Sequence, residues 1–176
     1  IAKPVTAFAV MRMQQQRLID INASIDTYLT SLTLAKGKQT TKAVVSFKNL
    51  LDHSSGLTAG GYMGYEKGAA IPSDRQTFNG EAPANTKATS VETTPGTVVS
   101  YSGAGYTLAE IALTDHFKQP FEQLMDTWAL SPLAWPAVPR VEIMAAWRWC
   151  SSMRNSDLLS ARQRPKVTNQ VCNRPG

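Results

Sequence analysis

Ile1-Ala2-Lys3-Pro4-Val5-Thr6-Ala7 begins the chain and leads into the first predicted helix. Across residues 3–18, apolar side chains recur at roughly three- to four-residue intervals, the spacing of a helix face turned toward a core. These side chains are Val5, Phe8, Ala9, Met13 and Leu18. We therefore expect a helix that carries Lys3 in its first turn.

Shorter helices are predicted further along the chain. Ser46 is a suitable N-cap for a helix over Phe47, Leu50 and Leu51, and Gly56 suits the end of that helix. A longer helix is expected at about 105–117, and Pro120 fits the first turn of the next one. The side chains expected to face inward from these two helices are Leu108, Ile111, Ala112, Phe117, Phe121, Leu124, Met125 and Trp128.

The stretch 58–100 separates these helices. It is rich in Gly, Pro, Thr, Ser and Asn and has little periodicity. A segment of this length is longer than an ordinary loop and is typical of an ordered functional excursion. The predicted fold class is therefore mainly α with long loops.

Charge is unevenly distributed along the 176 residues, whose net charge is +5. Residues 1–139 carry 8 Lys and 3 Arg against 11 Asp and Glu, whereas residues 140–176 carry 6 Arg and 1 Lys against Glu142 and Asp157. Both cysteines, Cys150 and Cys172, lie in the second part. We therefore predict two regions, 1–135 and a basic, Trp- and Arg-rich tail over 136–176.

Three stretches together resemble one known family. They are Lys3-x-x-Thr6-Ala7, Leu50-Leu51-Asp52-His53-Ser54-Ser55-Gly56-Leu57, and Tyr101-Ser102-Gly103-Ala104-Gly105-Tyr106. The family is the serine β-lactamase-like and penicillin-binding family, with class C β-lactamases, DD-peptidases and related esterases. The resemblance covers about residues 1–135. It implies the helical subdomain of a β-lactamase/transpeptidase-like α+β fold, with most of the sheet missing.

The resemblance assigns catalytic roles to Lys3 and Tyr101. In the family a nucleophilic Ser precedes the Lys by three residues, which places it immediately before Ile1. A Lys one helical turn from a Ser lies on the same face and can draw a proton from its hydroxyl. Tyr101 matches the Tyr of a Tyr-x-Asn motif that shares this transfer. Ser102 and Gly103 follow as candidate substrate-binding residues, with Gly103 where the family has Asn.

The family's third motif, Lys-Thr-Gly or His-x-Gly, is not found between residue 107 and Gly176. We therefore expect a fragment of a β-lactamase-related serine hydrolase, inactive as given, whose family forms an acyl-enzyme with a β-lactam, ester or peptide. One alternative is a non-catalytic remnant. Another is a module that binds nucleic acid or an anionic surface through residues 140–176. A shifted reading frame and an internal deletion both remain open as origins of the tail.

No metal site or cofactor is predicted. His53 and His116 are the two histidines, and no Asp, Glu or Cys cluster lies at ligand spacing from them. We interpret His53 as a packed or capping residue. From the family, the expected substrate is a small molecule or peptidoglycan-like, and the expected location is the periplasm or cell envelope.

Overall fold

The computed structural model describes residues 2–58, 60–62, 64–66 and 68–133. Its elements in chain order are α1 (Ala2–Gln15), η1 (Ile25–Thr27), α2 (Phe47–Leu51), α3 (Asp74–Asn79), α4 (Gly103–Phe117), α5 (Phe121–Met125) and η2 (Asp126–Leu130). Of these, η1 is a 3₁₀ turn and η2 a π-helical turn that continues α5. Within the described ranges, the isolated bridge recorded between extended segments joins Leu57 and Val91. For these residues, the predicted class of mainly α with long loops is confirmed.

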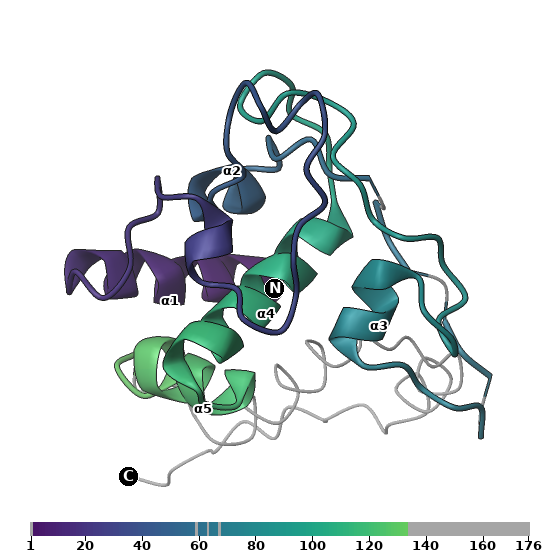
Figure 1. The fold of residues 1–176 in the computed structure, drawn as a ribbon. Helices are drawn as coiled ribbons and strands as arrows, with labels where there is room; N and C mark the ends of the chain where they lie inside the picture. Colours follow the sequence, from purple (N-terminus) through teal and green to yellow (C-terminus); the bar gives the residue numbers. More distant parts are fainter. Residues whose placement is uncertain (1, 59, 63, 67, 134–176) are drawn as a thin grey trace, which may run out of the picture.

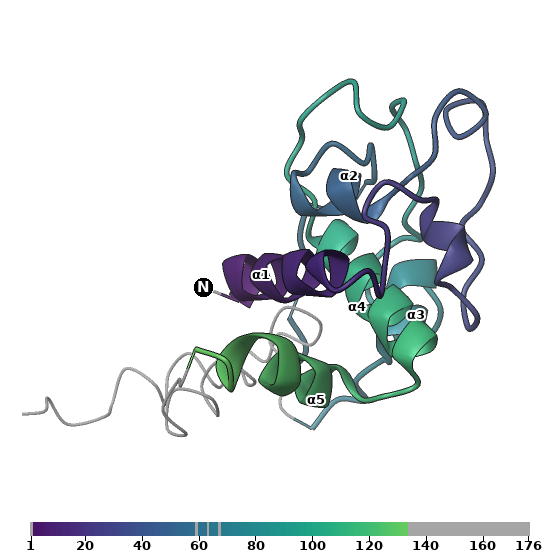
Figure 2. The same ribbon diagram turned by 90° about the vertical axis from the view of Figure 1, so that its left-hand side faces the viewer.

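Helix α4 occupies the centre of the fold (Figure 1). Helices α2 and α3 pack against it, while α1 packs against α5 and η2. Figure 2 shows α1 and α5 side by side, with α4 behind them. One hydrophobic core joins these elements. Burying a side chain such as Leu or Phe contributes about 1.5–3 kcal/mol, and the large side chains that are almost fully buried include Val10, Met13, Phe47, Leu108, Leu113 and Leu124.

The buried face of α1 differs from the predicted one at two positions. Phe8 is 39% exposed and Leu18, beyond the end of the helix, is 41% exposed. The face that packs inward instead includes Val10 and Thr6. A polar side chain is accepted there because the Thr6 hydroxyl donates to the carbonyl of Ala2 at 3.2 Å.

A short helix that we did not predict lies within the stretch 58–100. Its start is a capping box, in which Gln76 N donates to Ser73 Oγ at 3.3 Å and Ser73 N donates to Gln76 Oε1 at 2.9 Å. Its end is Gly80, with φ 66°. The helix buries Phe78 in the core. It therefore anchors the long excursion to the central helix α4.

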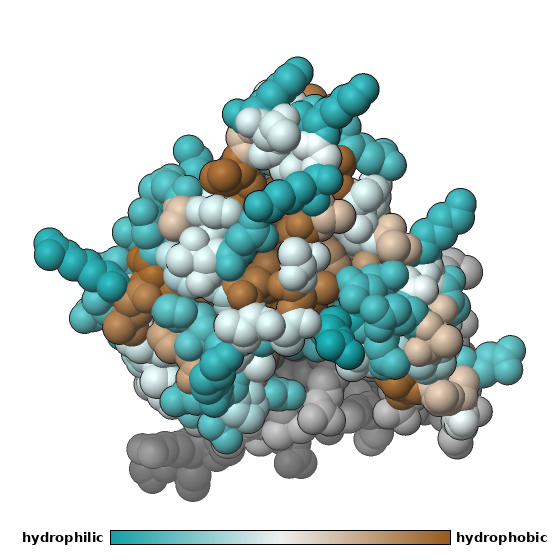
Figure 3. Space-filling model, viewed as in Figure 1, coloured by the Kyte–Doolittle hydropathy of each residue, from teal (hydrophilic) through white to brown (hydrophobic). Residues whose placement is uncertain are grey.

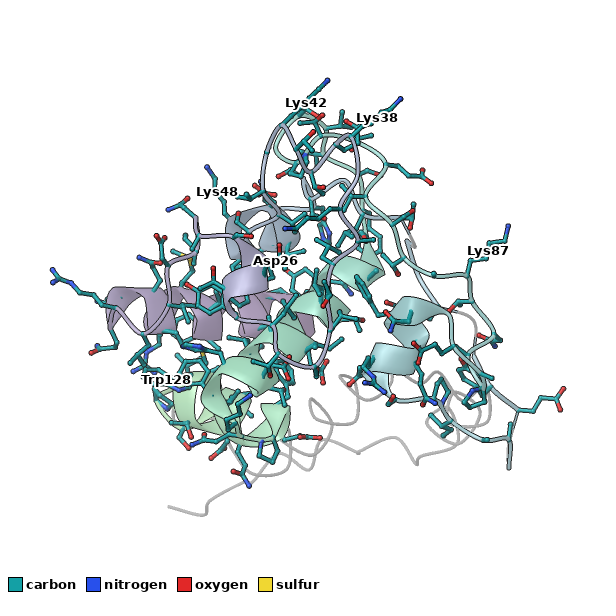
Figure 4. The ribbon with its side chains drawn as sticks, in the orientation of Figure 1. Asp26, Lys38, Lys42, Lys48, Lys87 and Trp128 are labelled. Carbon is teal, nitrogen blue, oxygen red and sulfur yellow. The ribbon has the colours of Figure 1, made fainter. Side chains whose placement is uncertain are left out.

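On the face shown in Figure 3, hydrophobic side chains reach the surface in patches separated by hydrophilic ones. Lys38 and Lys42 extend away from the body at one end of the molecule (Figure 4). None of the described helices is both long enough and apolar enough to cross a membrane. The predicted boundary near residue 135 and the tail 136–176 lie outside the described residues.

Candidate active site

The turn after α2 is built by short-range polar contacts. Ser46 caps the helix by accepting from Asn49 N, as predicted. At the other end Asp52 is the C-cap, and its carboxylate accepts the Ser54 amide at 2.9 Å as well as the Ser54 hydroxyl. His53 lies between them with φ 62°. The residue with a left-handed backbone directly after the helix is therefore His53. Gly56, which we expected to end the helix, lies three residues further along.

The segment that leads into α4 is hydrogen-bonded along this turn. Three of its backbone amides donate to three carbonyl groups of the turn, and this pairing brings Tyr101 beside His53. The bonds run from Glu92 to Gly56, from Gly96 to Ser54 and from Ser100 to His53, at 2.9, 2.8 and 2.9 Å. The stretch 50–57 is thus the support on which the Tyr101 segment rests.

Lys3 contacts two tyrosines, Tyr101 and Tyr106, that are distant from it in the sequence. Its Nζ lies 5.3 Å from the ring centroid of Tyr101 and 5.6 Å from that of Tyr106, both within the range of a cation–π contact. Tyr101 is 59% exposed. Tyr106 is half-buried, and its hydroxyl donates to the carbonyl of Leu51 at 3.1 Å. The two rings therefore differ: one is anchored, and the other faces solvent.

The His53 ring completes the cluster. Its centroid lies 4.7 Å from that of Tyr101 and 5.5 Å from that of Tyr106. Burial, and then the charge of Lys3, lower the pKa of His53 below its ordinary value. Burial also raises the pKa of Tyr106, an effect that Lys3 opposes. The site therefore favours the neutral form of His53.

Ser102 and Gly103 stand at the start of α4. The Ser102 hydroxyl is buried, accepts from Gly105 N at 3.3 Å as the N-cap and donates to the carbonyl of Thr58 at 3.1 Å. Gly103 N donates to Gly60 O at 3.1 Å, and a Cβ at Gly103 would lie 3.2 Å from that same oxygen. The predicted substrate-binding roles of both residues stay predictions.

Comparison with known proteins places this arrangement in a family. The β-lactamase family model matches residues 1–165. The chain belongs to the β-lactamase family. The resemblance predicted from the three stretches is confirmed. No curated protein sequence matches this β-lactamase-family chain significantly.

Solved structures support the β-lactamase-like fold. A β-lactamase/D-alanine carboxypeptidase from Yersinia pestis, complexed with citrate, superposes with a TM-score of 0.56 at 18% identity. EstCE1, a hydrolase with promiscuous acyltransferase activity, gives 0.56 at 20%, and a D-stereospecific amidohydrolase from Streptomyces sp. gives 0.55 at 19%. Each comparison covers 76% of this chain and 37%, 36% and 40% of the respective protein. The chain thus spans no more than two fifths of these β-lactamase-family relatives.

Two members of the cluster were missed from the sequence. We interpreted His53 as a packed or capping residue, and its ring does pack on Tyr101 and Tyr106, but we did not expect it to belong to the site. Tyr106 was noted only as part of the entry into a helix. The signal available was the specificity of the stretch 50–57, which resembles the β-lactamase family closely. Among the described residues, no group of three or more His, Cys, Asp or Glu side chains is placed to hold a metal ion.

Proposed function

We propose that this chain is part of a serine hydrolase of the β-lactamase family that works through an acyl-enzyme. The supporting observation is the contact between Lys3 and Tyr101, whose Nζ and ring centroid lie 5.3 Å apart although the two residues are far apart in the sequence. These are the two groups to which the family resemblance assigns proton transfer. The exposure of Tyr101 leaves its ring open to a substrate.

In the proposed reaction, a Ser immediately before Ile1 attacks the carbonyl carbon of the substrate. Its hydroxyl proton passes to Lys3, which enters the step as the neutral amine with Tyr101 as the second group of the proton relay, and the bond from Ser Oγ to carbon forms. The bond from that carbon to the leaving group then breaks, and the leaving group takes the proton. Water next cleaves the ester, which returns the Ser hydroxyl and releases the acid.

Gly103 bears on the substrate class. In the family, an Asn at this position orients the acyl-amide group of a β-lactam or peptide, and here that side-chain amide is absent. The backbone of Gly60 and Gly61 approaches the position so closely that a side chain would be crowded. We therefore propose small esters as substrates ahead of β-lactams and peptides.

The test is covalent labelling of the protein purified from its native source. A fluorophosphonate probe should add once, and peptide mapping should place the adduct on a Ser directly before Ile1. Lys3→Ala and Tyr101→Phe should slow labelling by about 10²-fold, the effect of losing a proton-transfer group. Lys48→Ala is the matched control, because Lys48 is an exposed lysine that points to solvent elsewhere on the surface (Figure 4). Absence of an adduct, or an adduct on another residue, would overturn the proposal.

The non-catalytic alternative predicts no adduct from any source. The binding alternative depends on residues 140–176, which lie outside the described part of the chain. Salt-sensitive retention on DNA that disappears when residues 140–176 are deleted would favour it. A periplasmic or envelope location remains an expectation from the family.

A further inference from the structure

His53 contacts the Tyr101 segment at three points. Its carbonyl accepts the Ser100 amide at 2.9 Å, and its ring Nδ1 accepts the Ser102 amide at 3.3 Å. Its ring also packs on the Tyr101 ring, with centroids 4.7 Å apart. One residue therefore holds both chain neighbours of Tyr101 as well as the tyrosine ring.

The backbone of His53 is strained in making these contacts. Its φ of 62° is in the left-handed region, which is uncommon for a residue other than glycine. Strain of this kind persists where the surrounding structure enforces it, and it concentrates at functional sites. In this conformation the carbonyl and the ring of His53 both contact the segment that contains Tyr101. A simple turn residue would need neither contact.

We propose that His53 is a positioning residue that holds Tyr101 in place through its neutral ring and releases it when the ring becomes protonated. For catalysis, this inference rests on the proposed function, because it concerns the proton-transfer tyrosine of that reaction. His53 acts through Tyr101.

The hydrogen-bond geometry explains the dependence on charge. A neutral imidazole that accepts at Nδ1 carries its proton on Nε2. A second proton would sit on Nδ1 and point at the Ser102 amide, so that two donors would face each other and the bond would be lost. The remaining bond, from Ser100 to the His53 carbonyl, would then hold the segment from one side of Tyr101 alone.

Charged and titratable groups face His53 from each element around it. Lys3 of α1 opposes a positive charge on the ring, whereas the hydrogen bond with the Ser102 backbone and, to a smaller extent, Asp52 in the preceding turn favour it. Tyr101 and Tyr106 present their rings. The balance lowers the pKa of His53, burial being the larger cause and Lys3 the next. We call the hydrogen bond from the Ser102 amide to His53 Nδ1 the latch. Since the pKa of His53 is lowered in the folded protein, the latch is fully formed above the ordinary histidine value of about 6.5 and is lost as pH falls through the lowered pKa.

The first experiment follows the full chain by NMR between pH 8 and pH 4.5. We expect the Ser102 amide and the Tyr101 ring signals to shift with one midpoint, the same as that of the His53 ring and below 6.5. His116, which is exposed and packs on Tyr28 and Phe117 instead, supplies the reference ring signals. Ser102 and Tyr101 signals that do not follow the His53 midpoint would overturn the inference.

Two substitutions separate positioning from packing. In His53→Asn, the Oδ1 atom occupies nearly the place of Nδ1, and Asn tolerates the left-handed region. Ser102 and Tyr101 should therefore keep their positions at pH 8, and their pH dependence should disappear. His53→Ala removes the acceptor and should shift both signals at every pH. His116→Asn is the matched control and should change neither. If Asn and Ala gave the same spectra, the role of His53 would be packing alone.

A third measurement connects the latch to the proposed reaction. In the native-source protein, His53→Ala should slow fluorophosphonate labelling by about 10²-fold at pH 7.5, the cost of a displaced catalytic group. His53→Asn should restore labelling to within a few-fold and should remove its decline at acidic pH. Unchanged labelling in His53→Ala would overturn the positioning role while leaving the serine hydrolase intact. Correlated NMR titrations without any labelling would instead remove the proposed function and leave the latch.

Discussion

Gly56 is the position where one added methyl group should separate the two segments of the site. Its φ is 73°, and a Cβ built on it would overlap the carbonyl oxygen of Thr93, with Thr93 Oγ1 a further 2.8 Å neighbour. The obstructing atom belongs to the backbone, so no side-chain rotation can relieve the overlap. The two chain segments would have to move apart, and they are the segments that place Tyr101 on His53.

The cost of Gly56→Ala has two parts. The left-handed backbone costs an Ala about 1–2 kcal/mol. Separation of the segments breaks the bond from Glu92 N to Gly56 O and the neighbouring bond from Thr58 N to Ser90 O, both 2.9 Å long. At about 1 kcal/mol for each bond, the total is about 3–4 kcal/mol, a large share of the roughly 5–15 kcal/mol that stabilises a typical domain.

Substitutions at two other glycines separate the backbone cost from the steric cost. Gly68 has φ 90° with nothing within 4 Å of its Cβ position, so Gly68→Ala should cost only the backbone part, about 1–2 kcal/mol. Gly37 has open space and no left-handed φ, so Gly37→Ala should stay within about 0.5 kcal/mol of the parent chain. The assay is urea unfolding followed by far-UV circular dichroism. Equal costs for Gly56→Ala and Gly68→Ala would refute the close approach to Thr93.

Three other changes test single interactions by the same unfolding assay. Tyr106→Phe should cost about 1 kcal/mol, because it removes the bond to Leu51 O; Tyr101→Phe should cost less than about 0.5 kcal/mol, and equal losses would contradict the assignment of the anchored ring. At Asp115, partial burial opposes a low pKa, but hydrogen bonds from Ser31 and Thr30 outweigh it and lower that pKa. Its contribution is thus present above the ordinary carboxyl value and is lost as pH falls through the lowered one. Asp115→Asn should cost about 1–2 kcal/mol at pH 7 and flatten the acid limb of the stability curve. Substitution of the exposed Asp26 by Asn is the comparison for the loss at pH 7 (Figure 4). Burial, with Asp74 and Glu122, raises the pKa of Glu110 well above its ordinary value, so its contribution is full at low pH and lost as pH rises. Glu110→Gln should therefore have a higher melting temperature than the parent at pH 8 and the same melting temperature near pH 4. A difference in melting temperature that does not change with pH would contradict this.

Helix positions were predictable where the sequence carries local signals. Ser46 caps α2, and the structure confirms this cap because the hydroxyl competes well for a free amide at a helix start. The same kind of signal, Ser73-x-x-Gln76 followed by Gly80, was present for α3 and was overlooked within a stretch rich in turn residues. Local chemistry was therefore sufficient for these elements, although one of them was missed.

The candidate site was predictable only in part. The family resemblance supplied Lys3 and Tyr101 as candidates, and the structure brings them together. His53 and Tyr106 join them through the left-handed turn after α2 and the pairing of the Tyr101 segment with it. Neither feature has a local sequence code, because a positive φ at His and a contact across some fifty residues depend on the whole fold. The part of the site that depends on contacts between distant residues could therefore not be predicted from the sequence.

Helix α1 shows why burial was harder to predict than helicity. Its buried face carries Val5, Ala9 and Met13, yet Phe8 and Met11 on the opposite side are also large and apolar, and they are 39% and 50% exposed. Apolar residues around much of a helix are typical of one that is buried on more than one side. Periodicity then cannot choose between faces, which is how Phe8 was assigned to the wrong one.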